Sequence, residues 1–99
     1  MATAELLKSW AVTERHLLDA RAFLEPEVAS LHSTSLEQFD EFLEHNELGL
    51  AFDWLESITR ESQWSTLPLL NALERAASNM HRDDDARGLR DRIRELEPE

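Results

Sequence analysis

The stretch from Ser35 to Glu61, SLEQFDEFLEHNELGLAFDWLESITRE, predicts two short amphipathic helices joined by a tight turn at residues 45–47. In its first half the apolar residues recur every three or four positions and share one side of a helical wheel: Leu36, Phe39, Phe42 and Leu43. The acidic residues share the opposite side: Glu37, Asp40, Glu41, Glu44 and Glu47. In the second half the apolar arc contains Leu48, Ala51, Phe52, Trp54, Leu55 and Ile58, and the polar side contains Asp53, Glu56 and Arg60. We therefore expect this hairpin to form the centre of the core and to carry most of the charge.

Upstream of the hairpin, the sequence predicts one long helix. It should begin after Thr3, a plausible N-cap, and end near Leu24, because Pro26 disfavours helical geometry at Glu25. One apolar stripe along it contains Leu6, Trp10, Leu17 and Leu24, and a second stripe contains Leu7, Ala11, Leu18 and Ala22. Two stripes predict that the helix packs against two neighbours.

Residues 26–35 are predicted to connect this helix to the hairpin. Val28 and Leu31 are expected to pack inward as a short turn. The pairs Thr34 with Glu37 and Ser35 with Gln38 both have the spacing of a capping box, which predicts the start of the next helix. That helix should end near Asn46, whose side chain tolerates a left-handed conformation.

Downstream of the hairpin, the sequence predicts two more helices after a loop at 59–66. Thr66 followed by Pro68 is typical of a cap with proline in the first turn, and the fourth helix then presents Leu70, Leu73, Ala77 and Met80. Three aspartates at 83–85 begin a fifth helix with the apolar stripe Ala86, Leu89, Ile93 and Leu96. Its alternating charges predict a solvated outer face. Residues 1–99 should therefore form a single all-α domain, a compact antiparallel bundle or array of four to five short helices.

The charge balance excludes several partners. The formal net charge is −11, and residues 34–61 alone carry −7. Such a surface repels nucleic acid and anionic membrane, so we expect neither as a partner and favour a protein with a basic surface. The chain has no cysteine, no apolar run long enough for a membrane span and no basic N-terminal segment before an apolar one. We therefore expect a cytoplasmic protein.

The sequence gives no pattern for catalysis or for cofactor binding. The four histidines, His16, His32, His45 and His81, lie on separate segments without a metal-ligand spacing. No nucleophile elbow and no phosphate-binding glycine loop is present, and the carboxylates are predicted on an outward face, without the burial or the neighbouring group that a general acid needs. We expect no metal, no cofactor and no enzymatic activity.

The acidic side of the hairpin is the candidate binding surface. The first hairpin helix has no basic residue between Leu36 and Asn46, so its like charges repel one another, and a chain that keeps this repulsion can use the field for binding. The candidate partner-binding residues are Glu37, Asp40, Glu41, Glu44, Glu47, Asp53, Glu56 and Trp64. Trp64 is included as a loop aromatic beside the hairpin, whereas Trp10 and Trp54 are predicted to be core residues. The alternative is that the charge only keeps the protein soluble.

Residues 42–55, FLEHNELGLAFDWL, followed by Leu69, Leu70, Leu73 and Met80, resemble small helical immunity proteins of bacterial polymorphic-toxin systems, the MafI-like group. The resemblance runs from Ser35 to about Arg82 and implies a non-catalytic cytoplasmic protein that binds and neutralises a cognate toxin. The same segment is similar to one helix junction of tetratricopeptide type, without an apparent second copy about 34 residues away. A helical adaptor or homodimer with an apolar binding surface is the second hypothesis, in which Leu50 and the second stripe of the first helix would be exposed.

Overall fold

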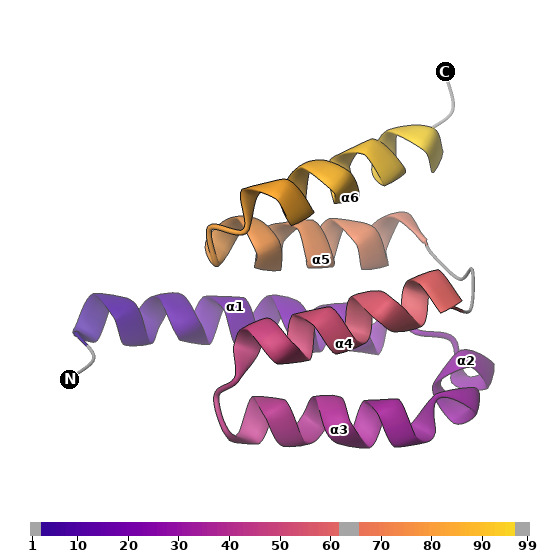
Figure 1. Ribbon diagram of the computed structural model, residues 1–99, viewed down its shortest axis with the longest axis horizontal. Helices are drawn as coiled ribbons and strands as arrows, with labels where there is room; N and C mark the ends of the chain where they lie inside the picture. The colour runs from indigo at the N-terminus through magenta and orange to yellow at the C-terminus, as the bar shows by residue number, and fades with distance from the viewer. Residues whose placement is uncertain (1–2, 62–65, 97–99) are drawn as a thin grey trace.

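A computed structural model describes residues 3–61 and 66–96, which form six helices and no strand (Figure 1). The helices are α1 (Ala4–Ala22), α2 (Pro26–Leu31), α3 (Ser33–Glu44), α4 (Leu48–Glu61), α5 (Leu67–Asn79) and α6 (Asp83–Leu96). The all-α prediction is confirmed, and α2 is an additional helix where the sequence predicted a turn. None of these six helices combines the length and the apolar character that crossing a membrane requires.

Three of the predicted helix boundaries are confirmed by their capping contacts. The Thr3 hydroxyl accepts from the Leu6 backbone N–H at 3.1 Å, and the Thr66 hydroxyl accepts from that of Leu69 at 3.4 Å. Asn46 has a φ of 57°, so it ends α3 in the left-handed conformation that its short side chain tolerates. Local sequence therefore determines where α1, α3 and α5 begin or end.

The predicted packing and capping of the connector are wrong. Leu31 is 82% exposed, whereas Val28 does pack against the core as predicted. Neither predicted capping box forms, because α3 begins earlier, at Ser33, with His32 as an N-cap that makes no side-chain capping bond. His32 donates its N–H to the Val28 carbonyl of α2 and accepts from the Leu36 N–H of α3, so one residue ends α2 and starts α3. The serine and threonine side chains are left without a capping role.

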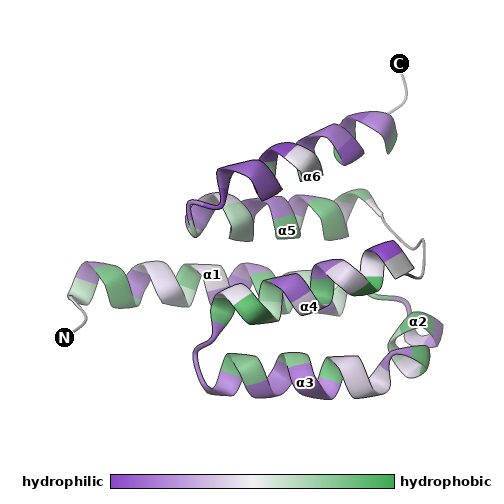
Figure 2. Cartoon of the chain, viewed as in Figure 1, coloured by the Kyte–Doolittle hydropathy of each residue, from purple (hydrophilic) through white to green (hydrophobic). Residues whose placement is uncertain are grey.

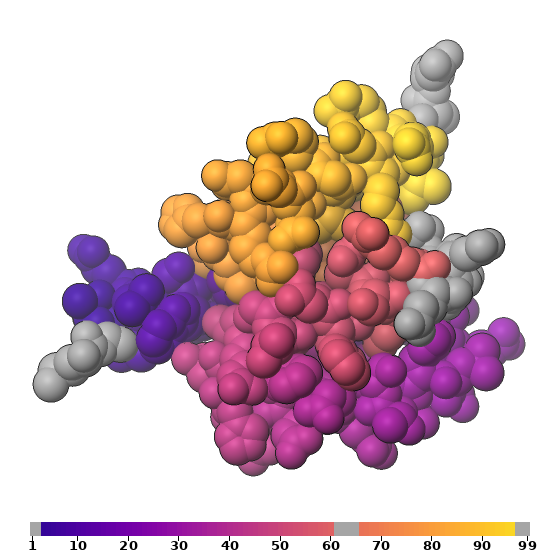
Figure 3. Space-filling model, viewed as in Figure 1, coloured from indigo at the N-terminus to yellow at the C-terminus, as the bar shows by residue number. Residues whose placement is uncertain are grey.

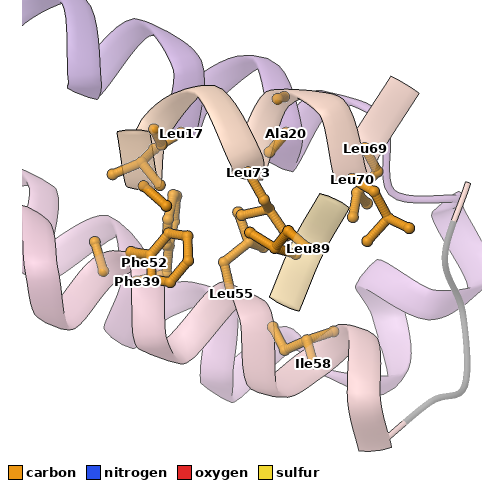
Figure 4. Packing of buried hydrophobic residues seen from close by; sticks show 14 of the residues in the cluster. Leu17, Ala20, Phe39, Phe52, Leu55, Ile58, Leu69, Leu70, Leu73 and Leu89 are labelled. Atoms are coloured by element: carbon orange, nitrogen blue, oxygen red, sulfur yellow. The ribbon is translucent and has the colours of Figure 1, made fainter. Parts of the chain in front are cut away.

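The helices form a flat fan in which α3 and α6 are the two edges (Figure 1). The molecule measures 44 × 32 × 18 Å, and the shortest dimension corresponds to about two layers of helix. α5 packs between α1 and α6, and α4 packs against α3, α1 and α5. Figure 4 shows the core at this junction, where Leu17 of α1, Leu73 of α5 and Phe39 and Phe52 of the hairpin converge. Both hairpin helices therefore contribute to the centre of the core, as predicted.

α1 uses only one of its two apolar stripes. Leu17 and Leu24 of the first stripe are buried, and Trp10 is half-buried against the core as predicted. The second stripe is exposed along its whole length: Leu7, Ala11, Leu18 and Ala22. α1 does contact two helices, α5 and α4, but it does so through the first stripe, so the predicted role of the second stripe is wrong. Figure 3 shows the N-terminal half of α1, in indigo, extending beyond the rest of the molecule.

Candidate protein-binding surface

α3 presents an uninterrupted row of carboxylates at one edge of the fan. Leu36 and Phe39 are buried on its inner side, and helical periodicity then turns the acidic positions outward. Glu37, Glu41 and Glu44 are exposed there, and Glu47 is exposed just beyond the end of the helix. We call these four residues the α3 acidic face.

Within residues 3–61 and 66–96, no cation pairs with the α3 acidic face. Its one side-chain contact is the Gln38 amide, which donates to Glu41 at 3.3 Å. Glu37 and Glu41 are one helical turn apart, as are Glu41 and Glu44, so their charges repel. The field of this face is therefore directed to the solvent without an internal counter-charge.

Asp40 borders this face but is already paired. Arg21 of α1 donates through Nε and Nη2 to the two carboxylate oxygens of Asp40, at 2.9 and 3.0 Å. This two-pronged geometry suits arginine, although the exposure of both side chains keeps the pair worth about 1 kcal/mol or less. The pair offsets the charge of Asp40 and links the edge helix α3 to α1.

Asp53 and Glu56 lie on the side of α4 that faces α6. Arg82, at the turn before α6, donates to Asp53 at 2.6 Å. Glu56 pairs with Arg60 on its own helix and lies 3.7 Å from the guanidinium of Arg92. The structure therefore separates Asp53 and Glu56 from the α3 acidic face and gives both of them cationic partners.

Arg82 is held from three directions. Its Nε donates to Asp85 at 2.8 Å, its Nη1 donates to the Gly49 carbonyl at 3.0 Å, and its guanidinium carbon lies 4.9 Å from the centroid of the Phe52 ring. Burial by itself would lower the pKa of Arg82, but the hydrogen bonds and charges of Asp53 and Asp85 outweigh it and raise the pKa above the ordinary arginine value. Arg82 therefore stays charged and ties the α5–α6 turn to α4.

Two arginines of α6, which the sequence predicted on a solvated face, form hydrogen bonds to neighbouring helices. Figure 2 shows α6 as hydrophilic over most of its surface, yet Arg90 donates to Glu74 of α5 at 2.9 Å. Arg92 donates to the buried Thr59 hydroxyl of α4 at 3.2 Å. Arg90 is exposed, as the predicted solvated face requires, whereas Arg92 is only partly exposed; both residues join α6 to its neighbours.

Trp54 is not the core residue that the sequence predicted. It is 41% exposed, and its ring meets the edge of Phe42 with centroids 5.9 Å apart and planes at 79°. The apolar arc of α4 is wider than α3 can cover, so Trp54 remains at the seam, and Leu50, one turn earlier, is 48% exposed. Gln38, one turn from both Glu41 and Phe42, lies between the α3 acidic face and Trp54. Trp64, the predicted aromatic anchor, lies outside the described residues.

A polar contact inside the helix layer was not predicted. The Asn79 amide, at the end of α5, donates to the Ser9 carbonyl at 2.8 Å and to the buried Thr13 hydroxyl at 2.6 Å. The sequence signal was Thr13 between Trp10 and Leu17 on the buried stripe of α1, where a hydroxyl requires a partner. This contact fixes the position of α1 along the axis of α5.

The described residues contain no group of three or more histidine, aspartate or glutamate side chains placed to hold a metal ion. Comparisons of the chain with protein-family models, with curated proteins and with solved structures give no match. The functional case therefore depends on the α3 acidic face and the exposed aromatic seam beside it.

Proposed function

We propose that this protein is a non-catalytic acidic binding protein of the immunity type, which docks the α3 acidic face on a basic surface of a cognate toxin. The observation that carries the proposal is the difference between the carboxylates. Asp40, Asp53 and Glu56 are neutralised inside the fold, whereas the α3 acidic face has no counter-charge among the described residues. A fold that pairs Asp40, Asp53 and Glu56 leaves this row available to a partner.

An unpaired row of carboxylates favours rapid association with a cationic surface. Opposite charges steer diffusional encounter and raise the association rate well above that of uncharged surfaces, an effect that salt screens. Lasting affinity usually comes from a desolvated aromatic or arginine anchor near the charged rim. Trp54, which is exposed and contacts Phe42 of α3, is suited to that role.

The test is charge reversal on the α3 acidic face in the full chain. The tagged protein is used to capture its partner from its native cells, and association with the purified partner is then measured at low and high salt. Glu41→Lys with Glu44→Lys should slow association at least about tenfold at low salt and leave dissociation less affected. Their effect should shrink at high salt, because screening already weakens the interaction.

A matched control variant changes the net charge equally at another place. Glu25→Lys with Glu27→Lys alters two exposed carboxylates around the start of α2, neither of which belongs to the α3 acidic face. This control should associate at nearly the unmodified rate. Equal slowing by both double variants would mean that only net charge matters, and undiminished binding by the α3 variant would exclude the α3 acidic face as the docking surface.

A second candidate function is supported by the exposed stripe of α1. Leu7 is 53% exposed, and Leu18 and Leu50 are exposed as the hypothesis of a helical adaptor or homo-oligomer requires. Apolar association of this kind strengthens or persists as salt rises. Salt dependence of the captured complex therefore distinguishes the two candidates.

A further inference from the structure

A pocket of about 360 Å³ opens at the end of the molecule where the α3–α4 turn and the α5–α6 turn lie. Figure 1 shows the α3–α4 turn and the α5–α6 turn at this end, beside the N-terminal half of α1. The volume lies within the range of small-ligand sites, roughly 300–1,000 Å³, and is sufficient for one long side chain. We call it the turn pocket.

One wall of the turn pocket is apolar. Leu6, Trp10, Leu48 and Met80 line it. Leu48 is buried, Trp10 and Met80 are half-buried, and Leu6 is 43% exposed at the pocket edge. Methylene groups would be covered by this wall, and the indole face would attract a cation placed near it.

Two helix C-termini border the pocket. Asn46 follows α3 and His81 follows α5, and among the described residues these are the two non-glycine positions with positive φ, 57° and 61°. Each turn satisfies three helix carbonyls through backbone N–H groups, those of residues 41–43 and those of residues 76–78. The carbonyls of residues 44–46 and 79–81 accept from no backbone N–H of the described residues, so both helix ends remain electron-rich.

Asn79 adds an acceptor whose orientation is fixed. Its amide nitrogen must face the Ser9 carbonyl, because a carbonyl can only accept, and this settles which way the carboxamide points. The carboxamide oxygen is then left without a donor among the described residues. The pocket is lined by no lysine, arginine, aspartate or glutamate, and its polar side chains are the hydroxyls of Ser9 and Thr13, the amides of Asn46 and Asn79, and the imidazole of His81.

We infer that the turn pocket binds a lysine side chain presented by the protein partner. Its methylene stem would lie along Leu6, Trp10 and Met80, and its ammonium would donate to the acceptors at the helix ends. Lysine suits this pocket better than arginine, because a compact ammonium has three donors for separate carbonyl oxygens, whereas the guanidinium fork matches a carboxylate that the pocket lacks. The identity of the occupant as a partner side chain rests on the proposed function, since a basic partner supplies it.

The first test is titration of the isotope-labelled full chain with α-acetyl-lysine amide, followed by NMR. Signals of the Trp10 indole, the Asn79 side-chain amide and the Asn46 and His81 backbone amides should move together and saturate, with half-saturation at about 1 mM for so small a ligand. α-Acetyl-norleucine amide has the same stem without the charge and should bind at least about fivefold more weakly. Equal binding by both would overturn the assignment of a cation site.

The second test is a variant in which a lysine of the protein itself occupies the turn pocket. Leu6→Lys places an ammonium at the pocket edge and should abolish the shifts caused by α-acetyl-lysine amide. Leu7→Lys adds the same charge on the neighbouring residue, which is exposed and does not line the pocket, and should leave them intact. Equal loss in both variants, or shifts spread over all surface carboxylates, would contradict the proposal.

A third titration separates the turn pocket from the proposed function. Hexalysine should shift both the pocket signals and the amides of Glu37, Glu41 and Glu44. Shifts at the α3 acidic face without pocket shifts would refute the lysine site and retain the docking surface. Pocket shifts without any response at α3 would support the lysine site and count against the docking surface.

Discussion

At the scale of single residues, Arg82 shows how one side chain can join three segments. Its contacts reach Asp53 and the Gly49 carbonyl in α4, Asp85 in α6 and the face of the Phe52 ring. Each contact alone contributes little at a partly exposed site. Together they satisfy Nε and both terminal nitrogens of a guanidinium whose side chain is 30% exposed, and they hold the α5–α6 hairpin against α4.

Arg82→Met should therefore destabilise the fold by about 1–2 kcal/mol, because it leaves Asp53 and Asp85 without their shared cation and removes the bond to the Gly49 carbonyl. The measurement is the free energy of unfolding from urea denaturation. Arg87→Met on the same helix is the control, since Arg87 makes only an exposed contact with Asp84 at 3.4 Å and should change stability by less than about 0.5 kcal/mol. Equal losses in the two variants would contradict a special role for Arg82.

The raised pKa of Arg82 also fixes the pH dependence of its contribution. A cation whose pKa is higher in the folded state stabilises the fold at every pH below its unfolded value, and this stabilisation is lost only as pH rises through the folded value. Arginine stays protonated far above neutrality. The stability difference between Arg82→Met and the unmodified protein should therefore be the same at about pH 6 and about pH 9. A difference that falls steeply within this interval would show that another titrating group controls the contact.

Sequence predicted the residues that interact with near neighbours in the chain. It missed those whose partners are distant in sequence. Thr3, Thr66 and Asn46 were predictable because a cap or a left-handed turn depends on a few neighbouring positions. Arg82 and Asn79 were not, because their partners lie tens of residues away in sequence. The helical wheel also could not show that Asp53 meets Arg82 and that Glu56 lies near Arg92, because both arginines are distant in sequence.

At the scale of elements, the apolar residues of α6 recur at helical spacing, but a glycine in the middle of the helix lowers its helix propensity. Ala86 and Leu89 are buried and Ile93 packs partly against the core, whereas Leu96 is exposed. Gly88 lies in the middle of this helix, and a β-carbon at that position would meet nothing within 4 Å. No close approach and no positive φ requires glycine at this position. Gly88 therefore lowers the stability of the helix, and no feature of its surroundings explains its presence.

Gly88→Ala should consequently stabilise the protein by about 1 kcal/mol, through the smaller conformational entropy of the unfolded chain and the higher helix propensity of alanine. Thermal unfolding followed by circular dichroism would show a rise of several degrees in Tm for a chain of this length, about 4–8 °C. Gly49→Ala, in the first turn of α4, is the comparison. Its new methyl group would lie 3.6 Å from the Arg82 guanidinium, so a smaller gain in stability is expected. A loss of stability in Gly88→Ala would show that α6 packs more closely than its surroundings indicate.

At the scale of the whole molecule, the fan exposes two different surfaces that sequence alone could not separate. Periodicity predicted which residues of each helix are apolar, but it could not predict which apolar face would remain uncovered. A fan only two helices thick covers one stripe of α1 and leaves Leu7 and Leu18 exposed, and it also leaves Trp54 at the α3–α4 seam. Acidic and apolar exposure therefore occur on the same small domain.

The balance between these surfaces predicts the oligomeric state. Two copies that met through the exposed stripe of α1 would each bring a formal charge of −11, so charge repulsion opposes their association at low salt. We therefore expect a monomer at low salt, with sedimentation that does not depend on concentration up to about 100 µM, where a dimer with a Kd of about 100 µM or tighter would be detected. Any dimer should appear only as salt screens the repulsion, and Leu18→Glu should remove it because it places a charge in the stripe. A dimer at low salt that Leu18→Glu dissociates would favour the homo-oligomer over the acidic inhibitor, since apolar association would then outweigh the charge that the proposed function uses.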